Sequence, residues 1–211
     1  DNDLPFFRIG KETGLSHNTI RQIIQDAEGY IWIGTEDGLN RFDGRKMIVF
    51  RSAADDPLSL SANFIEEIAI DADNNLWIAT VNGLNKLDQR LGYFERFTAK
   101  PDAPGSLPFA RIQTVLPDKD GQIWIGGQQL AALDPETKQF RVWDLPGQNA
   151  SNNNALIDCI ISTGPNELLL GTGRGMIRFN SAESYIQLIP LQSESHQRVI
   201  QVYQDREQRI W

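Results

Sequence analysis

The sequence predicts an all-β protein built from β-propeller blades, each made of four antiparallel strands. A recurring motif is the first reason: units aligned on one position are centred on Trp32, Trp77, Trp124, Leu169 and Trp211, at spacings of 45, 47, 45 and 42 residues. Periods of about 40 to 50 residues are typical of propellers and other repeat folds. Each unit also holds four short strand patterns, and no segment of ten or more residues has the 3.6-residue apolar period of a helix.

The strands follow in the same order in every unit. Apolar runs predict the first strand at 19–26, 64–71, 111–118, 156–163 and 199–205. A turn rich in Gly, Asn and Asp leads to the second strand, such as 30–35, which is apolar on both faces. Such a strand must be covered on both sides, as in a blade packed between two others. The third strand is typified by "GLNRF" and the fourth by "MIVF", "YFERF" and "FRVW".

These units predict an incomplete, truncated propeller with about four full blades and partial ones at both ends. The predicted boundaries are 1–16 for an outer strand (Phe6–Ile9) and lead-in, 17–61, 62–108, 109–154 and 155–196 for four blades, and 197–211 for the start of a fifth. We expect the chain to be part of a longer protein. Open blade edges predict self-association, either through those edges or as a dimer.

Composition excludes several functions. The chain has 211 residues and a formal net charge of -8, with Lys and Arg scattered, so nucleic acid is not an expected partner. No apolar run is long enough to cross a bilayer, and we expect membrane attachment only through C-terminal segments outside this chain. The single cysteine, Cys159, is predicted to be a packed residue. The two histidines lie in polar loops, so neither a metal site nor a cofactor is expected.

The segment "IRQIIQDAEGYIWIGTEDGLNRFDG", residues 20–44, resembles the two-component regulator propeller repeat. The second unit departs from the repeat at Asn75 and Ala79, the third at 129–131, and the fourth lacks both the Asp and the Trp. The resemblance implies a periplasmic sensor domain of a bacterial hybrid histidine kinase or diguanylate cyclase. Such a domain would be the ectodomain of an inner-membrane protein.

A ligand site is expected where polar side chains gather at one end of the blades. The loops entering strand one and the loops joining strands two and three share that end, and polar residues of the innermost strands line the central channel. The candidate ligand-binding residues are Asn18, Arg21, Glu36, Asp37, Asn63, Glu66, Asn82, Arg111, Gln113, Gln128, Asp158 and Arg174. A solvated channel wall without a ligand is the alternative. The turns at 71–75 and 118–121 are predicted to be hairpin turns rather than calcium loops.

The function predicted from the resemblance is non-enzymatic. The chain is expected to bind a small molecule or an oligosaccharide outside the cytoplasm, and to relay its presence to a kinase or cyclase output. A protein-interaction scaffold is the first alternative, and a propeller glycosidase or lyase is a weaker one. The acidic cluster formed by 36–37 and 66–67 has no base placed beside it, so no catalytic residue is assigned.

Overall fold

The computed structural model describes residues 8–100, 103–145, 156–183, 185–189 and 198–211. The described residues form sixteen strands and one 3-10 helix, η1 (Lys11–Thr13). The first two sheets contain β1 (Ile20–Gln25), β2 (Ile31–Thr35), β3 (Gly38–Phe42), β4 (Met47–Phe50), β5 (Ile65–Ile70), β6 (Leu76–Thr80), β7 (Gly83–Asp88) and β8 (Tyr93–Phe97). The other two contain β9 (Thr114–Pro117), β10 (Ile123–Gly126), β11 (Leu130–Asp134), β12 (Gln139–Trp143), β13 (Ile157–Gly164), β14 (Glu167–Thr172), β15 (Gly175–Asn180) and β16 (Tyr185–Ile189).

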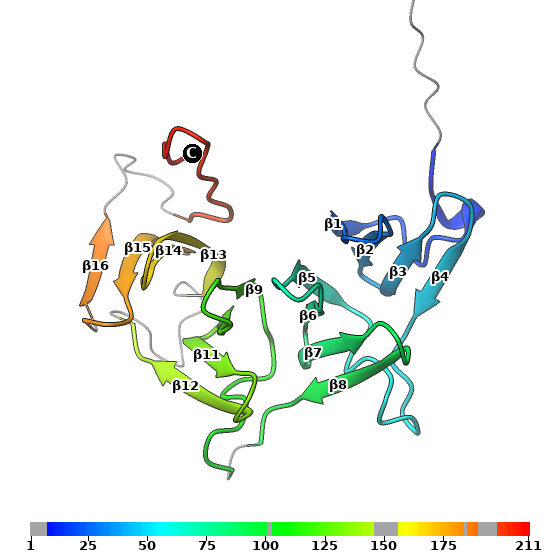
Figure 1. Cartoon of the computed structure of the whole chain (residues 1–211), viewed down its shortest axis with the longest axis horizontal. Helices are drawn as coiled ribbons and strands as arrows, with labels where there is room; N and C mark the ends of the chain where they lie inside the picture. The colour runs from blue at the N-terminus through cyan, green and yellow to red at the C-terminus, as the bar shows by residue number, and fades with distance from the viewer. Residues whose placement is uncertain (1–7, 101–102, 146–155, 184, 190–197) are drawn as a thin grey trace, which may run out of the picture.

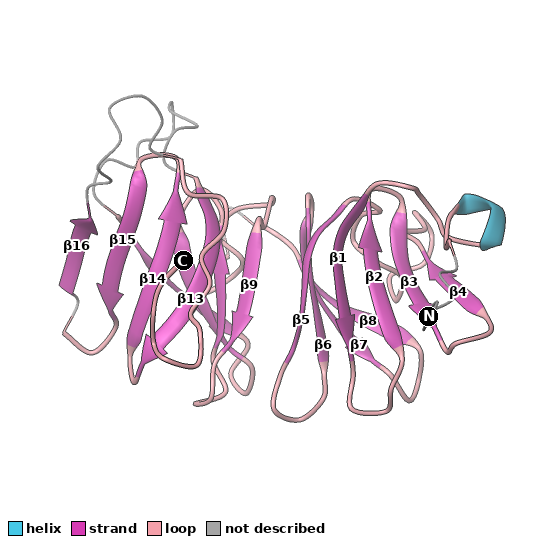
Figure 2. Ribbon diagram, turned by 90° about the horizontal axis from the view of Figure 1, so that it is seen from above, coloured by secondary structure: helices cyan, strands magenta, loops and turns pink. Residues whose placement is uncertain are grey.

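Each group of four consecutive strands forms one antiparallel sheet in sequence order. Figure 1 shows the four sheets arranged as an arc, with β1, β5, β9 and β13 facing the common centre and β4, β8, β12 and β16 at the outer rim. The arc is open on one side and does not close into a ring. The predicted all-β, incomplete propeller is therefore confirmed. In Figure 2 the loops gather at two opposite ends of the strands, as a stack of up-and-down blades requires.

Most strands begin and end where the repeat predicts, and the exceptions lie at the starts of units. The strand predicted at 111–118 is only β9, and the amide of Ile112 before it donates to Thr80 O of the preceding blade at 3.0 Å. The strand predicted at 199–205 is absent, and the pair Gln204 and Ile210 forms an isolated bridge. Of the predicted outer strand Phe6–Ile9, residues 6–7 lie outside the described residues, and residues 8–9 are not in a strand. The blade boundaries stay a prediction.

The hydrophobic core lies between blades. One cluster joins Trp32 of the first blade to Ile65 and Ile68 of the second, and the next two clusters repeat this arrangement. The central tryptophans are almost fully inaccessible to solvent: Trp32 is 0%, Trp77 1% and Trp124 2% exposed. Burying such a ring is worth about 2–4 kcal/mol. The tryptophans therefore fill the interface between blades, as their two-sided apolar strands predict.

Glycines on the second strands allow the next blade to approach closely. A Cβ built on Gly34 would lie 2.8 Å from Ile65 Cγ2, and one built on Gly126 would lie 2.6 Å from Ile157 Cγ2. Both isoleucines are the apolar anchors at the start of the following blade. Even one methyl group is thus too large at these positions.

Linkers between blades cover part of the outer strands. The amide of Phe94 on β8 donates to Leu58 O at 2.7 Å, and Arg96 donates to Ser59 O at 2.5 Å and to Asp56 O at 2.7 Å. These bonds satisfy one edge of the second sheet with the linker that leads into it. Large apolar side chains remain exposed on β1 and on 198–211, namely Ile20, Ile23, Ile200, Tyr203 and Trp211. The predicted self-association stays a prediction.

Candidate functional site

Two arginines from different blades share one buried carboxylate on the inner strands. Arg21 Nη2 of β1 donates to Glu66 Oε2 at 3.0 Å, and Arg111 Nη2 donates to Glu66 Oε1 at 2.5 Å. The Glu66 side chain is 3% exposed, whereas those of Arg21 and Arg111 are 42% and 58% exposed. A carboxylate this buried requires charged partners and hydrogen bonds. The structure thus brings together three predicted site residues, from three consecutive blades.

A second charged group lies one blade further along the arc. Arg198 donates from Nε and Nη2 to the two oxygens of Asp158, both at 2.9 Å, and Gln113 Nε2 donates to Asp158 Oδ1 at 3.3 Å. The buried oxygen Oε1 of Gln113 has no hydrogen-bond partner among the described residues. Asp158 and Gln113 are both predicted site residues. They form part of the same inner-strand surface as Glu66.

Sequence reasoning missed Arg198, although the sequence holds a signal for it. In the third and last units an arginine precedes the apolar anchor, giving Arg111 before Ile112 and Arg198 before Val199. In the second and fourth units an acid follows the anchor, at Glu66 and Asp158. Each arginine pairs with the acid of the preceding blade. Comparing the charges of adjacent units could have predicted these two ion pairs.

Glu67 ties the second blade to the third through its carboxylate. Its Oε2 accepts a hydrogen bond from the amide of Val115 on β9 at 2.7 Å. Burial raises the pKa of Glu67, while the hydrogen bonds from Thr114 and Val115 act in the opposite direction. Burial likewise raises the pKa of the Cys159 thiol to about 11. A thiol with such a pKa is protonated at neutral pH, so Cys159 is a packed residue and not a nucleophile.

The predicted loop residues mostly hold the loops together. Asn63 Oδ1 accepts from the amide of Ser52 at 2.7 Å, and its Nδ2 donates to Asp37 Oδ1 at 3.3 Å. Asp37 also pairs with Arg51 at 3.1 Å. Asn18 Oδ1 accepts from the amide of Lys11 at 3.0 Å. These side chains have structural partners, and none of them is in hydrogen-bond contact with the inner-strand arginines.

The remaining four predicted residues lie apart from one another. Glu36 Oε2 is 3.9 Å from His17 Nδ1, and Asn82 Nδ2 is 3.5 Å from Ser61 O. Gln128 is exposed, and the backbone amide of Arg174 donates to Thr172 Oγ1 at 3.1 Å. The structure does not gather them into one site. Their predicted role in ligand binding stays a prediction.

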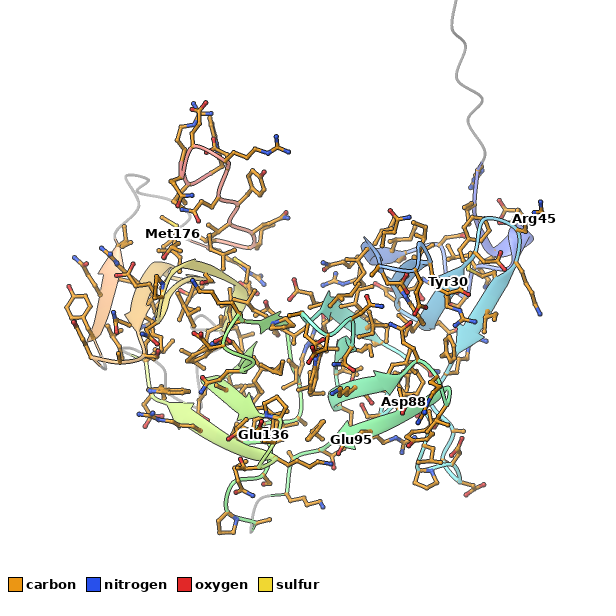
Figure 3. All side chains as sticks on the ribbon, in the orientation of Figure 1. Tyr30, Arg45, Asp88, Glu95, Glu136 and Met176 are labelled. Atoms are coloured by element: carbon orange, nitrogen blue, oxygen red, sulfur yellow. The ribbon has the colours of Figure 1, made fainter. Side chains whose placement is uncertain are left out.

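Two grooves in the described part of the chain lie at the opposite end of the strands. One has a volume of about 570 Å³ and runs between the third and fourth blades, lined by Trp143, Arg141 and the turn that begins at Asp118. The other, of about 710 Å³, is lined by Asp88, Glu95 and their neighbours on the second blade. Asp88 and Glu95, which are labelled in Figure 3, lie on this second groove. Glu95 also forms an ion pair with Lys138 of the third blade.

Among the described residues, no group of three or more His, Cys, Asp or Glu side chains could hold a metal ion. The turns at 71–75 and 118–121 are hairpin turns, as predicted. In the first, Asp71 Oδ1 accepts from the amides of Asp73 and Asn75 at 3.0 and 2.8 Å. The Asp71 carboxylate is thus occupied by the turn itself. Within the described ranges no helix is long and apolar enough to span a membrane.

Together these features define a class: an open β-propeller arc with a charged inner surface. The family model for the two component regulator propeller matches residues 14–37, 59–82 and 106–129. Three segments of the chain therefore match the two component regulator propeller repeat, and the resemblance predicted from the sequence is confirmed.

Several known proteins share the sequence or the fold. "Histidine kinase P4" of Formosa agariphila is 43% identical over 47 residues, which is 22% of this chain and 3% of that protein. The extracellular domain of BT3049 from B. thetaiotaomicron, assigned to a hybrid two component system, is similar with a TM-score of 0.83 and 24% identity, over 97% of this chain and 28% of that one. The virginiamycin B lyase of Staphylococcus aureus has a TM-score of 0.70 at 14% identity, over 94% of this chain and 64% of its own.

These matches differ in what they imply. The chain spans about a quarter of the extracellular domain of BT3049 and a small part of the curated kinase. At such low identity, the structural similarities establish the fold alone. The same architecture occurs in the extracellular domain of a two component system and in a lyase, so function must be argued from the site.

Proposed function

We propose that this chain is part of an extracytoplasmic sensor domain of a bacterial transmembrane signalling protein, and that it binds a small ligand on its inner-strand surface. The family repeats and the match to a histidine kinase support the sensor assignment. The similarity to extracellular domains of two component systems supports a location outside the cytoplasm. The output is proposed to be a histidine kinase or a diguanylate cyclase.

The observation that carries the proposal is the group formed by Arg21, Glu66 and Arg111. Three blades each contribute one side chain to it. A ligand that contacts both arginines would touch the first and third blades at once, while Glu66 holds the second blade between them. Ligand binding could then change how the blades are inclined to one another. Such a change requires different contacts in the bound and free states.

The experiment is a thermal-shift screen of the protein against neutral and charged saccharides and small metabolites. A ligand that binds only the folded state raises Tm as its concentration exceeds Kd. We expect at least one compound to raise Tm in the natural protein but not in the variant Arg111→Gln. Stabilisation of both proteins alike would place the ligand elsewhere. A complete lack of stabilisation would instead favour the scaffold alternative, in which the partner is a protein.

Catalysis is not proposed for this chain. The inner-strand carboxylates Glu66 and Asp158 are each paired with arginine. General acid and base pairs need carboxyl groups whose pKa values differ and which reach the substrate. The oxygens of both carboxylates are instead occupied by arginine donors.

A further inference from the structure

The Arg21–Glu66–Arg111 group leaves hydrogen-bond donors unused. Each arginine donates to Glu66 from Nη2 alone. A guanidinium carries five N–H donors, and the Nε and Nη1 groups of both arginines form no hydrogen bond or ion pair with another described residue. Both side chains are about half exposed. Two guanidinium groups thus present free donors next to the same carboxylate.

The charge of this group is positive, although that of the whole chain is negative. Arg21 and Arg111 together carry two positive charges against the single charge of Glu66, in a chain with a net charge of -8. The Glu67 carboxylate accepts from Val115 on the next blade, and it pairs with neither arginine. Burial raises the pKa of Glu67, while its hydrogen bonds from Thr114 and Val115 act in the opposite direction. A local positive potential in a negatively charged molecule attracts anions to one place.

The Arg198–Asp158 pair provides an internal contrast. Arg198 faces both oxygens of Asp158 with two nitrogens, which is the bidentate geometry that uses the guanidinium fork. One positive and one negative charge cancel in this pair. This pair lies on the same inner-strand surface, but it has no net positive charge. Arg198 also has fewer unused N–H donors, because both Nε and Nη2 are bonded to Asp158. The structural pair and the proposed binding group can therefore be tested against each other.

We propose that Arg21 and Arg111, each bonded to one oxygen of Glu66, bind the oxyanion of a small ligand, either a carboxylate or a sulfate group. This inference rests on the proposed function and names the chemical class of the ligand. Planar and tetrahedral oxyanions accept parallel N–H donors from arginine. The guanidinium of Arg21 lies over the ring of Phe64, with its Cζ 5.8 Å from the ring centroid, and this contact orients it.

Calorimetric titration at constant ionic strength tests the inference with matched probes. D-glucuronate carries a carboxylate, D-glucuronamide has nearly the same shape without the charge, and sodium sulfate supplies a tetrahedral oxyanion. We expect glucuronate to bind, glucuronamide to bind at least tenfold more weakly, and sulfate to compete with glucuronate. The variants Arg21→Gln and Arg111→Gln should each weaken glucuronate binding at least tenfold. The matched variant Arg198→Gln should change it less than twofold.

The controls separate binding from folding. Thermal unfolding of each variant checks that it is folded, and Arg111→Lys keeps the charge but loses the fork, so we expect an intermediate affinity. Equal binding of glucuronate and glucuronamide overturns the inference, as does an equal loss in Arg198→Gln and Arg111→Gln. If neutral compounds stabilise the natural protein but not Arg111→Gln, and no oxyanion does, the inference is wrong and the proposed function stands. If neither class binds, both are wrong.

Discussion

The indole nitrogen of Trp32 donates a hydrogen bond to the carboxylate of Asp26, with Nε1 and Oδ2 2.7 Å apart. The same pair, six residues apart, recurs as Trp77 with Asp71, Trp124 with Asp118 and Trp211 with Asp205, at 2.7 to 3.0 Å. In the fourth unit Leu169 replaces the tryptophan and the aspartate is missing as well. In the first three units, the acid of the turn and the buried ring of the following strand therefore act as one unit.

Loss of the turn acid should destabilise the fold. Asp71→Ala removes the partner of the Trp77 indole and of the amides of Asp73 and Asn75. We expect the free energy of unfolding to fall by roughly 2–3 kcal/mol, because buried donors are left unsatisfied. Urea denaturation measures this change. In the same turn Asp73 is exposed, so Asp73→Ala should change the stability by less than about 0.5 kcal/mol, and an equal loss in both variants would contradict the explanation.

A methyl group on a second-strand glycine should separate two blades. In Gly126→Ala the new Cβ would lie 2.6 Å from both Ile157 Cγ2 and Thr114 Cγ2. Such overpacking costs about 1–3 kcal/mol. Gly164 is the matched control, since a Cβ added there would lie 3.9 Å from its nearest neighbouring atom. Differential scanning calorimetry should show a lower Tm for Gly126→Ala, and a similar Tm for Gly164→Ala and the natural protein.

A buried amide network should matter in the second blade. Asn85 Oδ1 accepts from the amide of Ser61 at 2.9 Å, and Asn85 Nδ2 donates to Ser61 Oγ at 2.9 Å. Asn85→Ala leaves these groups unsatisfied, and we expect a loss of about 1–3 kcal/mol in the free energy of unfolding. Asn82→Ala, in the preceding loop, is the control and should have almost no effect on stability. Hydrogen exchange of the Ser61 amide should be faster in Asn85→Ala alone.

The buried carboxyl of Glu67 should make stability depend on pH. Because burial raises its pKa in the folded state, Glu67 favours folding below its unfolded pKa of about 4.3, and this contribution is lost as pH rises through the folded pKa. Glu67→Gln keeps an acceptor for the amide of Val115 without the charge. We expect Glu67→Gln to be more stable than the natural protein at pH 7. The stability of the two proteins should be similar near pH 4. Thermal unfolding of both proteins at pH 4 and pH 7 measures this difference. If Glu67→Gln were less stable than the natural protein at pH 7, the ionised carboxylate would be required for stability.

Much of the fold could be predicted because the repeat is explicit in the sequence. The third strand Gly38–Phe42 and the fourth strand Tyr93–Phe97 begin and end where the motif places them. The first strands were harder to predict, because an apolar run does not show where the backbone leaves its own sheet. At Ile112 the amide donates to the blade before it, and that choice depends on tertiary packing. Local pattern alone contains no such information.

The candidate site was only partly predictable for a similar reason. Polar residues in apolar inner strands, such as Arg21 and Glu66, indicate a water-accessible surface, and the structure pairs them. Loop polarity was less informative, since Asn63 and Asn18 use their side chains to cap neighbouring backbone amides. A polar side chain that satisfies its own loop has the same sequence signature as one that awaits a ligand. Only the hydrogen-bond partners distinguish the two.

Successive units are also joined by one recurring backbone hydrogen bond. The amides of Ile112, Ile157 and Val199 donate to Thr80 O, Gly127 O and Thr172 O of the preceding units, at 2.9 to 3.0 Å. Each unit contacts mainly its neighbours. Heat or denaturant should therefore unfold the terminal units first, before the units in the middle of the arc. The effect of a mutation or a bound ligand in one unit should likewise be largest in the adjacent unit and smaller in each unit further along the arc.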